Sequence, residues 1–270
     1  MLHRRINGYD MAYLELGEGT PLVCVHGTLG DFRVWSPVVG PLSRHRRVVA
    51  LSLRHFFPEH WDGIGSDYTI AQHVADVTGF IEAMDDGPVD LMGHSRGGHI
   101  AFRVAQRRPD LLRRLVLAEP GGDLDATLSA GGAAAAPASF GTRYTATAER
   151  ISAGDIEGAL MIFSEIVGGP GAWPNVPAAV RQTWRDNART LAGQVNEQRQ
   201  PFTRADAESI RVPTLFVGGT DTEGTLPAVL RALAAHVPDA RVAMIPGARH
   251  FMFEDDPVQF CAVVTEFLEG

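Results

Sequence analysis

A serine flanked by glycines stands directly after an apolar run, in the stretch Gly93-His94-Ser95-Arg96-Gly97. The preceding residues "VDLM" read as a strand and the following ones as a helix, so the pattern predicts a sharp strand-to-helix turn. Such a turn exposes the Ser95 hydroxyl for nucleophilic attack, and its glycines let neighbouring backbone approach a strained residue. Without the flanking strand and helix, a structural Gly-rich turn would be the better interpretation.

A serine hydroxyl is a weak nucleophile at neutral pH and needs a neighbouring base. Of the ten histidines, His250 follows a predicted strand and loop and precedes the last predicted helix. That position would bring it to the same edge of a sheet as Ser95, which makes His250 the candidate base. Most single histidines are structural, and we expect this of four others: His45, His60, His73 and His236.

A carbonyl under attack also needs hydrogen-bond donors for its developing oxyanion. The stretch "VCVHGTLGD" ends a predicted strand at Gly27 and Thr28. A glycine turn there can direct the amide of Thr28 towards the amide of Arg96, the residue after the candidate nucleophile. The alternative is that His26 and Gly27 form an ordinary strand exit.

Two carboxylates compete for the role of orienting the imidazole of His250. Glu119 in "LVLAEPGG" ends one predicted strand, and Asp221 in "VGGTDTEG" follows the next. We favour Glu119, because an acidic residue at the end of a buried strand is otherwise hard to explain. Asp221 remains the alternative, and whichever carboxylate is not catalytic would be a supporting or surface group.

The apolar runs that precede these residues alternate with amphipathic stretches, which predicts a mostly parallel sheet buried on both faces. Seven segments read as strands: 11–16, 21–27, 46–53, 89–95, 112–119, 214–219 and 240–247. Four read as helices: 69–84, 98–108, 225–236 and 256–268. Ligands of such sheets bind at the carboxyl ends of the strands, so the polar residues above should gather along one edge.

A central region interrupts this alternation. It contains a small-residue loop, "SAGGAAAAPASFG", and two stretches with helical spacing of apolar residues, 156–167 and 180–195. We expect these helices to fold over the strand ends as a lid. The predicted organisation is a core in two segments with a helical cap between them: 1–121 and 206–270 for the core, 122–205 for the cap.

Composition excludes several functions. The net charge of −8 argues against a nucleic-acid partner, which requires a basic face. All 24 basic residues are arginine, so Schiff-base chemistry and a lysine general base are excluded. Cys24 and Cys261 lie far apart in apolar segments and read as buried free thiols.

The sequence has no signal-peptide pattern at its start and no apolar run of about 18 residues that could span a bilayer. We therefore expect a cytoplasmic protein without a membrane partner. A homodimer is compatible with the sequence.

Taken in order, the motifs "VCVHGTLGD", "LMGHSRGG" and "IPGARH", with a cap between the last two, resemble the α/β-hydrolase fold superfamily. The resemblance implies an eight-stranded, mostly parallel sheet with helices on both faces and the catalytic order Ser, acid, His. A catalytic acid at Glu119, at the end of its predicted strand, resembles the position of the acid in zearalenone-type lactonases and haloalkane dehalogenases. Dehalogenase and epoxide-hydrolase chemistry is disfavoured, because those relatives carry Asp where Ser95 stands.

The segment 51–63, "LSLRHFFPEHWDG", departs from the superfamily, in which many members carry an Asp-x-x-Gly-x-Gly-x-Ser loop. Its His55, Glu59, His60 and Asp62 could suggest a metal site, but their spacing fits no familiar ligand pattern. We expect a hydrogen-bonded loop and no metal.

The resemblance implies a serine hydrolase of carboxylic esters or lactones that needs no metal or organic cofactor. Leu29 and Trp184 are the candidate substrate-binding residues, and the aromatic cap suggests an apolar acyl group or ring. The same triad could also hydrolyse C–C bonds of β-diketone-like substrates or catalyse cofactor-free perhydrolysis. A non-catalytic small-molecule receptor on this fold is a further alternative, since a fold does not determine a function.

Overall fold

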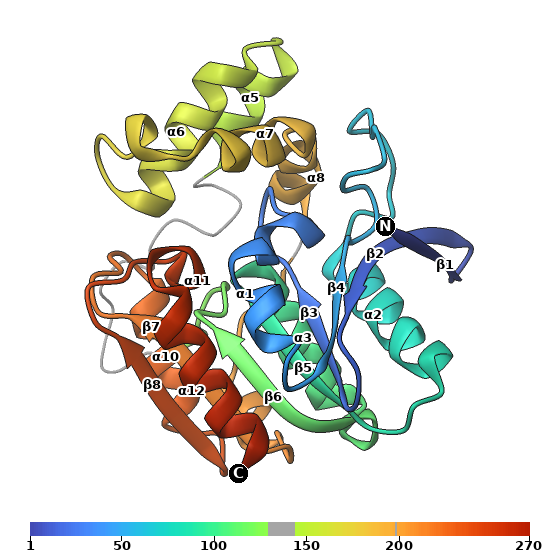
Figure 1. Cartoon of the computed structure of the whole chain (residues 1–270). Helices are drawn as coiled ribbons and strands as arrows, with labels where there is room; N and C mark the ends of the chain where they lie inside the picture. Colours follow the sequence, from blue (N-terminus) through green and yellow to red (C-terminus); the bar gives the residue numbers. More distant parts are fainter. Residues whose placement is uncertain (129–143, 198) are drawn as a thin grey trace.

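The computed structural model describes residues 1–128, 144–197 and 199–270. Its centre is an eight-stranded sheet in the order β1-β2-β4-β3-β5-β6-β7-β8 (Figure 1). The pairs β1/β2 and β2/β4 are antiparallel and all other pairs are parallel. The strands are β1 Leu2–Ile6, β2 Tyr9–Leu16, β3 Pro21–Val25, β4 Arg47–Leu51, β5 Val89–His94, β6 Leu112–Ala118, β7 Thr214–Gly219 and β8 Ala240–Ile245.

The predicted eight-stranded, mostly parallel sheet is confirmed; six strands lie within the predicted segments, and β2 begins two residues before its segment. Strand β1 lies outside them. Its residues are mostly polar and exposed because it is an edge strand, paired on one side to β2 alone, and it therefore lacks the apolar run of a buried strand.

Helices cover both faces of the sheet because successive strand residues point to opposite sides. In β3, Val23 and Val25 pack in one apolar cluster, whereas Leu22 and Cys24 pack in the other. The first cluster includes side chains of α2 (Ile70–Met84), α3 (Arg96–Arg107), α9 (Arg204–Glu208) and α10 (Leu226–Ala234). The second includes side chains of α1 (Ser36–Leu42), α11 (Met252–Asp255) and α12 (Pro257–Glu269).

The four predicted core helices are observed within a few residues of their predicted bounds. The start of α2 illustrates the local cause: the Thr69 side chain accepts a hydrogen bond from the Gln72 amide at 3.0 Å, which caps the helix. Asp85, in the left-handed conformation with φ 55°, ends it. Cys24 and Cys261 are free and buried, as predicted.

The insertion after β6 is helical and lies over the carboxyl ends of the strands (Figure 1). Its helices are α5 (Thr145–Ser152), α6 (Ile156–Gly168), α7 (Ala178–Asp186) and α8 (Thr190–Asn196). They enclose their own apolar cluster, which also takes in Leu29 of the core. The predicted loop "SAGGAAAAPASFG" lies outside the described residues.

The stretch 180–195, predicted to be one helix, is divided into α7 and α8 by a turn at 187–189. Asn187 forms this break. Its Nδ2 donates to Asp31 Oδ2 at 2.8 Å, and its Oδ1 accepts from the Phe57 amide at 2.7 Å. Apolar spacing carried no sign of this polar contact between insertion and core, so the prediction of one helix was wrong.

Among the described ranges 1–128, 144–197 and 199–270, no helix has the length and hydrophobicity that crossing a bilayer requires.

Candidate active site

Ser95 occupies the corner between β5 and α3. Its backbone has φ 51° and ψ −118°, a conformation that non-glycine residues rarely adopt. Two backbone hydrogen bonds hold the corner: the Ser95 amide donates to Ala118 O at 3.0 Å, and the Gly121 amide donates to Ser95 O at 2.8 Å. A strained serine at the end of a buried strand is the geometry that the motif predicted.

The two outer glycines of the motif are required by close backbone contacts. A Cβ atom on Gly93 would lie 2.3 Å from Gly97 O, and one on Gly97 would lie 2.2 Å from Val25 O. Any side chain at either position would push α3 away from β5 and β3. The glycines therefore let the start of α3 pack directly against the strand ends around Ser95.

His250 follows β8 and forms a buried hydrogen bond with Glu119, which follows β6. His250 Nδ1 lies 2.7 Å from Glu119 Oε2, and the two side chains are 3% and 1% exposed. The other carboxylate oxygen, Oε1, accepts from the Gly219 amide at 3.0 Å. Hydrogen bonds on both oxygens fix the carboxylate, which in turn orients the imidazole so that Nε2 is left for another partner.

His94 fixes the backbone beside this pair. Its Nε2 donates to His250 O at 2.9 Å, and the two rings lie 4.5 Å apart between centroids. Burial, and then the neighbouring His250, holds the pKa of His94 well below its ordinary value. His94 is therefore a neutral donor, and its hydrogen bond connects the end of β5 to the loop that carries His250.

Asp221, the alternative acid, is exposed and has other partners. Its carboxylate accepts from Thr220 Oγ1 at 2.9 Å, and its amide donates to Ala248 O at 2.9 Å. Of the two candidate carboxylates, Glu119 is the one that contacts His250.

The candidate oxyanion-hole residues both flank Ser95. A Cβ atom on Gly27 would lie 3.0 Å from Ser95 Cβ, so the end of β3, which Thr28 follows, lies against the serine. Arg96 is the first residue of α3, where an amide has no acceptor within its own helix. Neither the Thr28 nor the Arg96 amide donates a hydrogen bond to another described residue, which leaves both able to bind a developing oxyanion.

The two candidate substrate-binding residues lie in the apolar cluster of the insertion. Leu29 is fully buried with φ 58°, and Trp184 is 3% exposed. The Trp184 ring contacts Phe163 edge-on at 5.0 Å and lies 6.1 Å from Phe251, the residue after His250.

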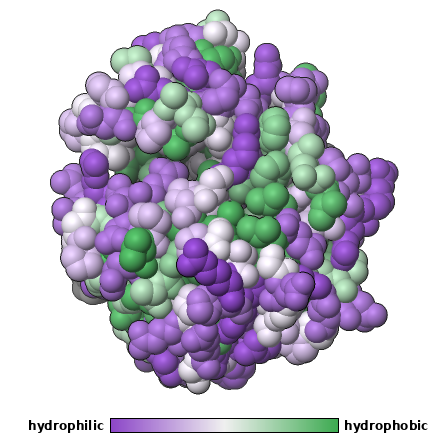
Figure 2. Space-filling view, viewed as in Figure 1, coloured by the Kyte–Doolittle hydropathy of each residue, from purple (hydrophilic) through white to green (hydrophobic). Residues whose placement is uncertain are grey.

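A pocket opens between the insertion and the His250 loop, and the space-filling view shows a hollow there with apolar residues in it (Figure 2). Trp184 and Phe251 line it, together with Glu254 and Arg249. Burial, with a smaller effect of Asp255, raises the pKa of Glu254 to about 7. The pocket is therefore mostly apolar with a titratable group at its wall.

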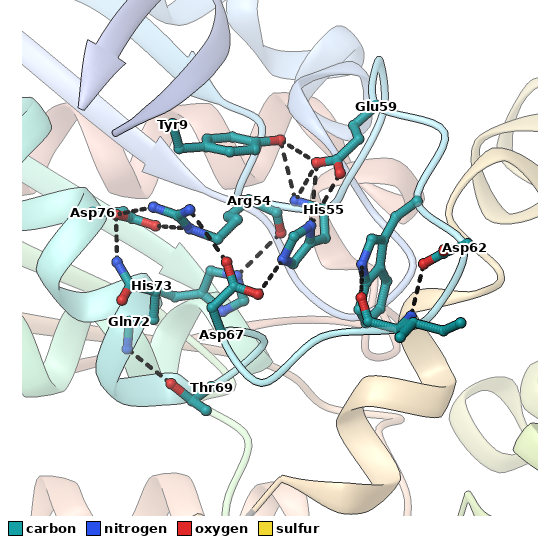
Figure 3. Close-up of polar contacts among 12 residues, drawn as sticks. Tyr9, Arg54, His55, Glu59, Asp62, Asp67, Thr69, Gln72, His73 and Asp76 are labelled. Atoms are coloured by element: carbon teal, nitrogen blue, oxygen red, sulfur yellow. Dashed lines mark hydrogen bonds and ion pairs between the residues drawn. The ribbon is translucent and has the colours of Figure 1, made fainter. Parts of the chain in front are cut away.

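The loop that departs from the superfamily is hydrogen-bonded (Figure 3). His55 Nδ1 lies 3.1 Å from Glu59 Oε1, and its Nε2 lies 2.8 Å from Asp67 Oδ1. The Asp62 carboxylate accepts from the Ile64 amide at 2.8 Å. In the part of the chain that the structure describes, no group of three or more His, Cys, Asp or Glu residues is placed to hold a metal ion.

Sequence reasoning missed the polar contacts between insertion and core. Thr28 Oγ1 donates to Gln194 Oε1 at 2.9 Å, and Arg96 Nη2 donates to Glu197 Oε1 at 2.6 Å. Both partners belong to the end of α8 or the residue after it. No motif marks them, because their position near Ser95 depends on how the insertion folds back.

A model of the alpha/beta hydrolase fold matches residues 20–257 of the chain. The chain therefore belongs to the alpha/beta hydrolase fold family, among the hydrolases with a helical insertion over the strand ends. This is the superfamily that its motifs resemble.

Individual relatives are more distant. An uncharacterised protein of Mycobacterium bovis is 27% identical over 289 residues, which cover 98% of this chain and 80% of that protein. A 2-hydroxy-6-oxo-2,4-heptadienoate hydrolase of Pseudomonas putida is 38% identical over 114 residues, 41% of each chain. The solved enol-lactonase of Burkholderia xenovorans LB400 is 22% identical with a TM-score of 0.80 and full coverage of both chains, a likeness that shows the fold alone.

Proposed function

We propose that this protein is a serine hydrolase of carboxylic esters or lactones, with Ser95 as nucleophile, His250 as base and Glu119 as the acid of the triad. The observation that carries the proposal is the buried contact of 2.7 Å between His250 and Glu119, beside a serine held in a strained strand-to-helix corner. These are the three roles that nucleophilic acyl transfer requires.

The reaction would run in two steps. His250 Nε2 takes the Ser95 proton while the serine oxygen attacks the carbonyl carbon, and the carbonyl electron pair moves onto its oxygen. The Thr28 and Arg96 amides hold this oxyanion. Collapse breaks the bond to the leaving alkoxide, which receives the proton from His250 and leaves an acyl-enzyme.

In the second step, His250 takes a proton from water, and the hydroxide attacks the acyl carbon. Collapse of this second tetrahedral intermediate returns the proton to Ser95 and releases the carboxylic acid. The negative charge of Glu119 stabilises the imidazolium formed in each step and fixes its tautomer. Protein side chains and water supply every atom transferred.

Residues 122–205 would act as the cap that selects the substrate. The proposal is supported by the pocket between this segment and the His250 loop, whose wall includes Trp184. Leu29 would support this wall from the core, because it follows Thr28 and packs in the same apolar cluster as Trp184.

The proposal is tested with a fluorophosphonate probe and with p-nitrophenyl acetate and butyrate. Wild-type protein should be labelled at Ser95 and should release p-nitrophenol. Ser95→Ala should abolish both, and the control Ser43→Ala, whose hydroxyl donates to Gly40 O, should retain both. Folded wild-type protein that is neither labelled nor active would overturn the proposal and favour a receptor.

A second candidate is C–C bond hydrolysis by the same triad. It is supported by the 38% identity, over 41% of the chain, to a 2-hydroxy-6-oxo-2,4-heptadienoate hydrolase. Turnover of β-diketones or of such dienoates, with p-nitrophenyl esters as slower substrates, would favour this reaction over ester hydrolysis.

A further inference from the structure

The side chain of Arg96 lies fully buried immediately beside the proposed nucleophile. Its Nη2 donates to Glu197 Oε1 at 2.6 Å and to His73 Nδ1 at 2.9 Å. The guanidinium also lies over the Tyr68 ring, with 4.8 Å between the guanidinium carbon and the ring centroid. Both hydrogen bonds therefore come from Nη2, and the contact with Tyr68 is made by the plane of the guanidinium.

The other two nitrogens have no acceptor among the described residues. Arg96 Nε and Nη1 are both buried without a hydrogen-bond partner there. Nε carries one and Nη1 two of the five N–H groups of a guanidinium, so three donors have no acceptor among the described residues. The residues outside the described part, 129–143 and 198, include no Asp or Glu that could supply a counter-charge.

Among the described residues, the polar contacts of Arg96 include a single carboxylate, that of Glu197. His73 Nε2 donates to Arg54 O at 3.1 Å, so its Nδ1 is a neutral acceptor (Figure 3). Burial, and then Arg96 itself, holds the pKa of His73 well below its ordinary value. The carboxylate of Glu197 is shared, since its Oε2 also accepts from Arg199 at 3.0 Å. A buried guanidinium with unsatisfied donors is costly unless an acceptor such as an anion or a water completes its contacts.

The end of α8 connects this cation to the proposed oxyanion hole. Gln194 Oε1 accepts from Thr28 Oγ1, while Glu197, three residues further on, binds Arg96. Gln194 Nε2 is likewise buried without a partner among the described residues. Arg96, which follows Ser95, and Gln194, which contacts Thr28, thus both carry buried donors without a partner among the described residues.

We propose that the substrate carries an ionised carboxylate, close to its scissile carbonyl, that pairs with the guanidinium of Arg96. The inference rests on the proposed function, since it specifies the substrate class of that site. Arg96 would then have two roles: its backbone amide binds the oxyanion, and its side chain selects esters or lactones of dicarboxylic acids. Water on the same donors, without substrate selection, is the alternative that the experiment separates.

The test compares esters that differ only in charge. The p-nitrophenyl monoesters of succinic, glutaric and adipic acid are each measured against the same compound with its free carboxyl capped as a methyl ester, with spontaneous hydrolysis subtracted. For the best of the three lengths, kcat/KM of the wild type should favour the charged ester by about tenfold or more, as expected of a charge-assisted hydrogen bond.

Two variants should move this ratio in opposite directions. The ratio is kcat/KM for the charged ester divided by kcat/KM for its methyl-capped form. Arg96→Met removes the guanidinium and should bring this ratio to about one or below. Glu197→Gln removes the competing carboxylate and should raise the ratio. Arg103→Met is the matched control: Arg103 is also a buried arginine of α3, but its donors reach Asp206 and the carbonyls of Gln200 and Pro201. Its ratio should equal that of the wild type.

Binding measured without catalysis separates the two proposals. Glutarate should raise the Tm of Ser95→Ala in a saturable way that sodium chloride at equal ionic strength does not reproduce, and Ser95→Ala/Arg96→Met should lose the effect. Glutarate binding without any ester turnover would contradict the proposed function but retain the anion site. Ratios at or below one for all three lengths, or a ratio unchanged in Arg96→Met, would overturn the anion site and leave the hydrolase proposal intact.

Discussion

Glu119 and His250 are 131 residues apart in the sequence, yet the Glu119 carboxylate lies 2.7 Å from the imidazole Nδ1 of His250. Glu119 sits at the end of β6 with φ 42°, and the Gly219 amide of the adjacent strand β7 holds its second oxygen. Because the pair is almost fully buried, the interaction is little screened by solvent. An ionised Glu119 can therefore stabilise a positive charge on His250 strongly.

The contact predicts a ranking of two variants. Glu119→Gln keeps the size of the side chain but removes its charge and offers an amide that favours the wrong tautomer of His250. It should lower kcat by about 10⁴, the effect known from the serine-protease template. Asp221→Asn should keep kcat within about tenfold, because the Asp221 carboxylate binds Thr220.

Steady-state kinetics on p-nitrophenyl butyrate measure this ranking, after circular dichroism has established that both variants are folded. The reverse ranking would identify Asp221 as the acid. Equal losses would mean that both carboxylates are needed.

Trp184 should govern substrate choice. Trp184→Ala removes an aromatic wall of the pocket next to the His250 loop, so kcat/KM for bulky acyl groups should change relative to that for acetate. The cavity left in the cap cluster should also reduce the free energy of unfolding by about 3–5 kcal/mol.

A matched control is Leu160→Ala, which shortens another buried side chain of the same cluster that does not line the pocket. This variant should lose stability with an unchanged ratio between the two substrates. A uniform change for every ester in Trp184→Ala would mean destabilisation alone.

Gly97 should tolerate no side chain. Gly97→Ala places Cβ 2.2 Å from Val25 O, so α3 or β3 must shift, at a cost of about 3 kcal/mol or more in the free energy of unfolding. Gly40→Ala is the control: Gly40 lies in α1, and apart from its chain neighbours and its own helix backbone no atom lies within 4 Å of the added Cβ. It should change the free energy of unfolding by no more than about 1 kcal/mol, because the helix propensity of alanine opposes the steric cost of a Cβ directly before Pro41. Urea denaturation measures both, and a Gly97→Ala variant as stable as the wild type would contradict the close packing of the corner.

The buried histidines should make the protein less stable in mild acid. Burial lowers the pKa of His26 from 6.5 to about 4, and burial also holds the pKa of three others well below 6.5: His73, His94 and His99. Between pH 6.5 and 4 the unfolded state binds protons at these sites while the folded state does not. Each site then lowers the free energy of unfolding by up to about 1.4 kcal/mol per pH unit as pH falls.

Two carboxyl groups oppose this trend. Burial raises the pKa of Glu254 to about 7 and also raises that of Asp90, so these groups take up protons in the folded state first. With four histidines against two carboxyl groups, Tm should be at least about 5 °C lower at pH 5 than at pH 7.5. Differential scanning calorimetry over this range measures it, and a Tm that is level or rises towards pH 5 would show that the histidines are not buried as neutral groups.

Much of the fold is encoded locally. Continuous Val, Leu and Ile runs mark strands buried on both faces, and polar residues directly after them must lie at one edge of a parallel sheet. Ser95, Thr28, Glu119 and His250 could therefore be placed at this edge from the sequence. Strand β1 could not be found in this way, because a polar edge strand has no buried run.

Which of the two carboxylates contacts His250 was decided by the tertiary structure, because Glu119 and Asp221 follow neighbouring strands at the same edge of the sheet. What separates them is the backbone at that edge: the Gly219 amide draws the Glu119 carboxylate inward, whereas the Asp221 side chain is exposed.

The surroundings of Arg96 were likewise decided by the tertiary structure. Ser95 and Arg96 form a recognisable motif, but the partners of the Arg96 side chain come from α2 and from the residue after α8. Contacts between segments so far apart depend on how the cap helices pack and where the chain turns, as at Asn187. Local periodicity carries no information about such long-range polar contacts, so only the folded chain determines them.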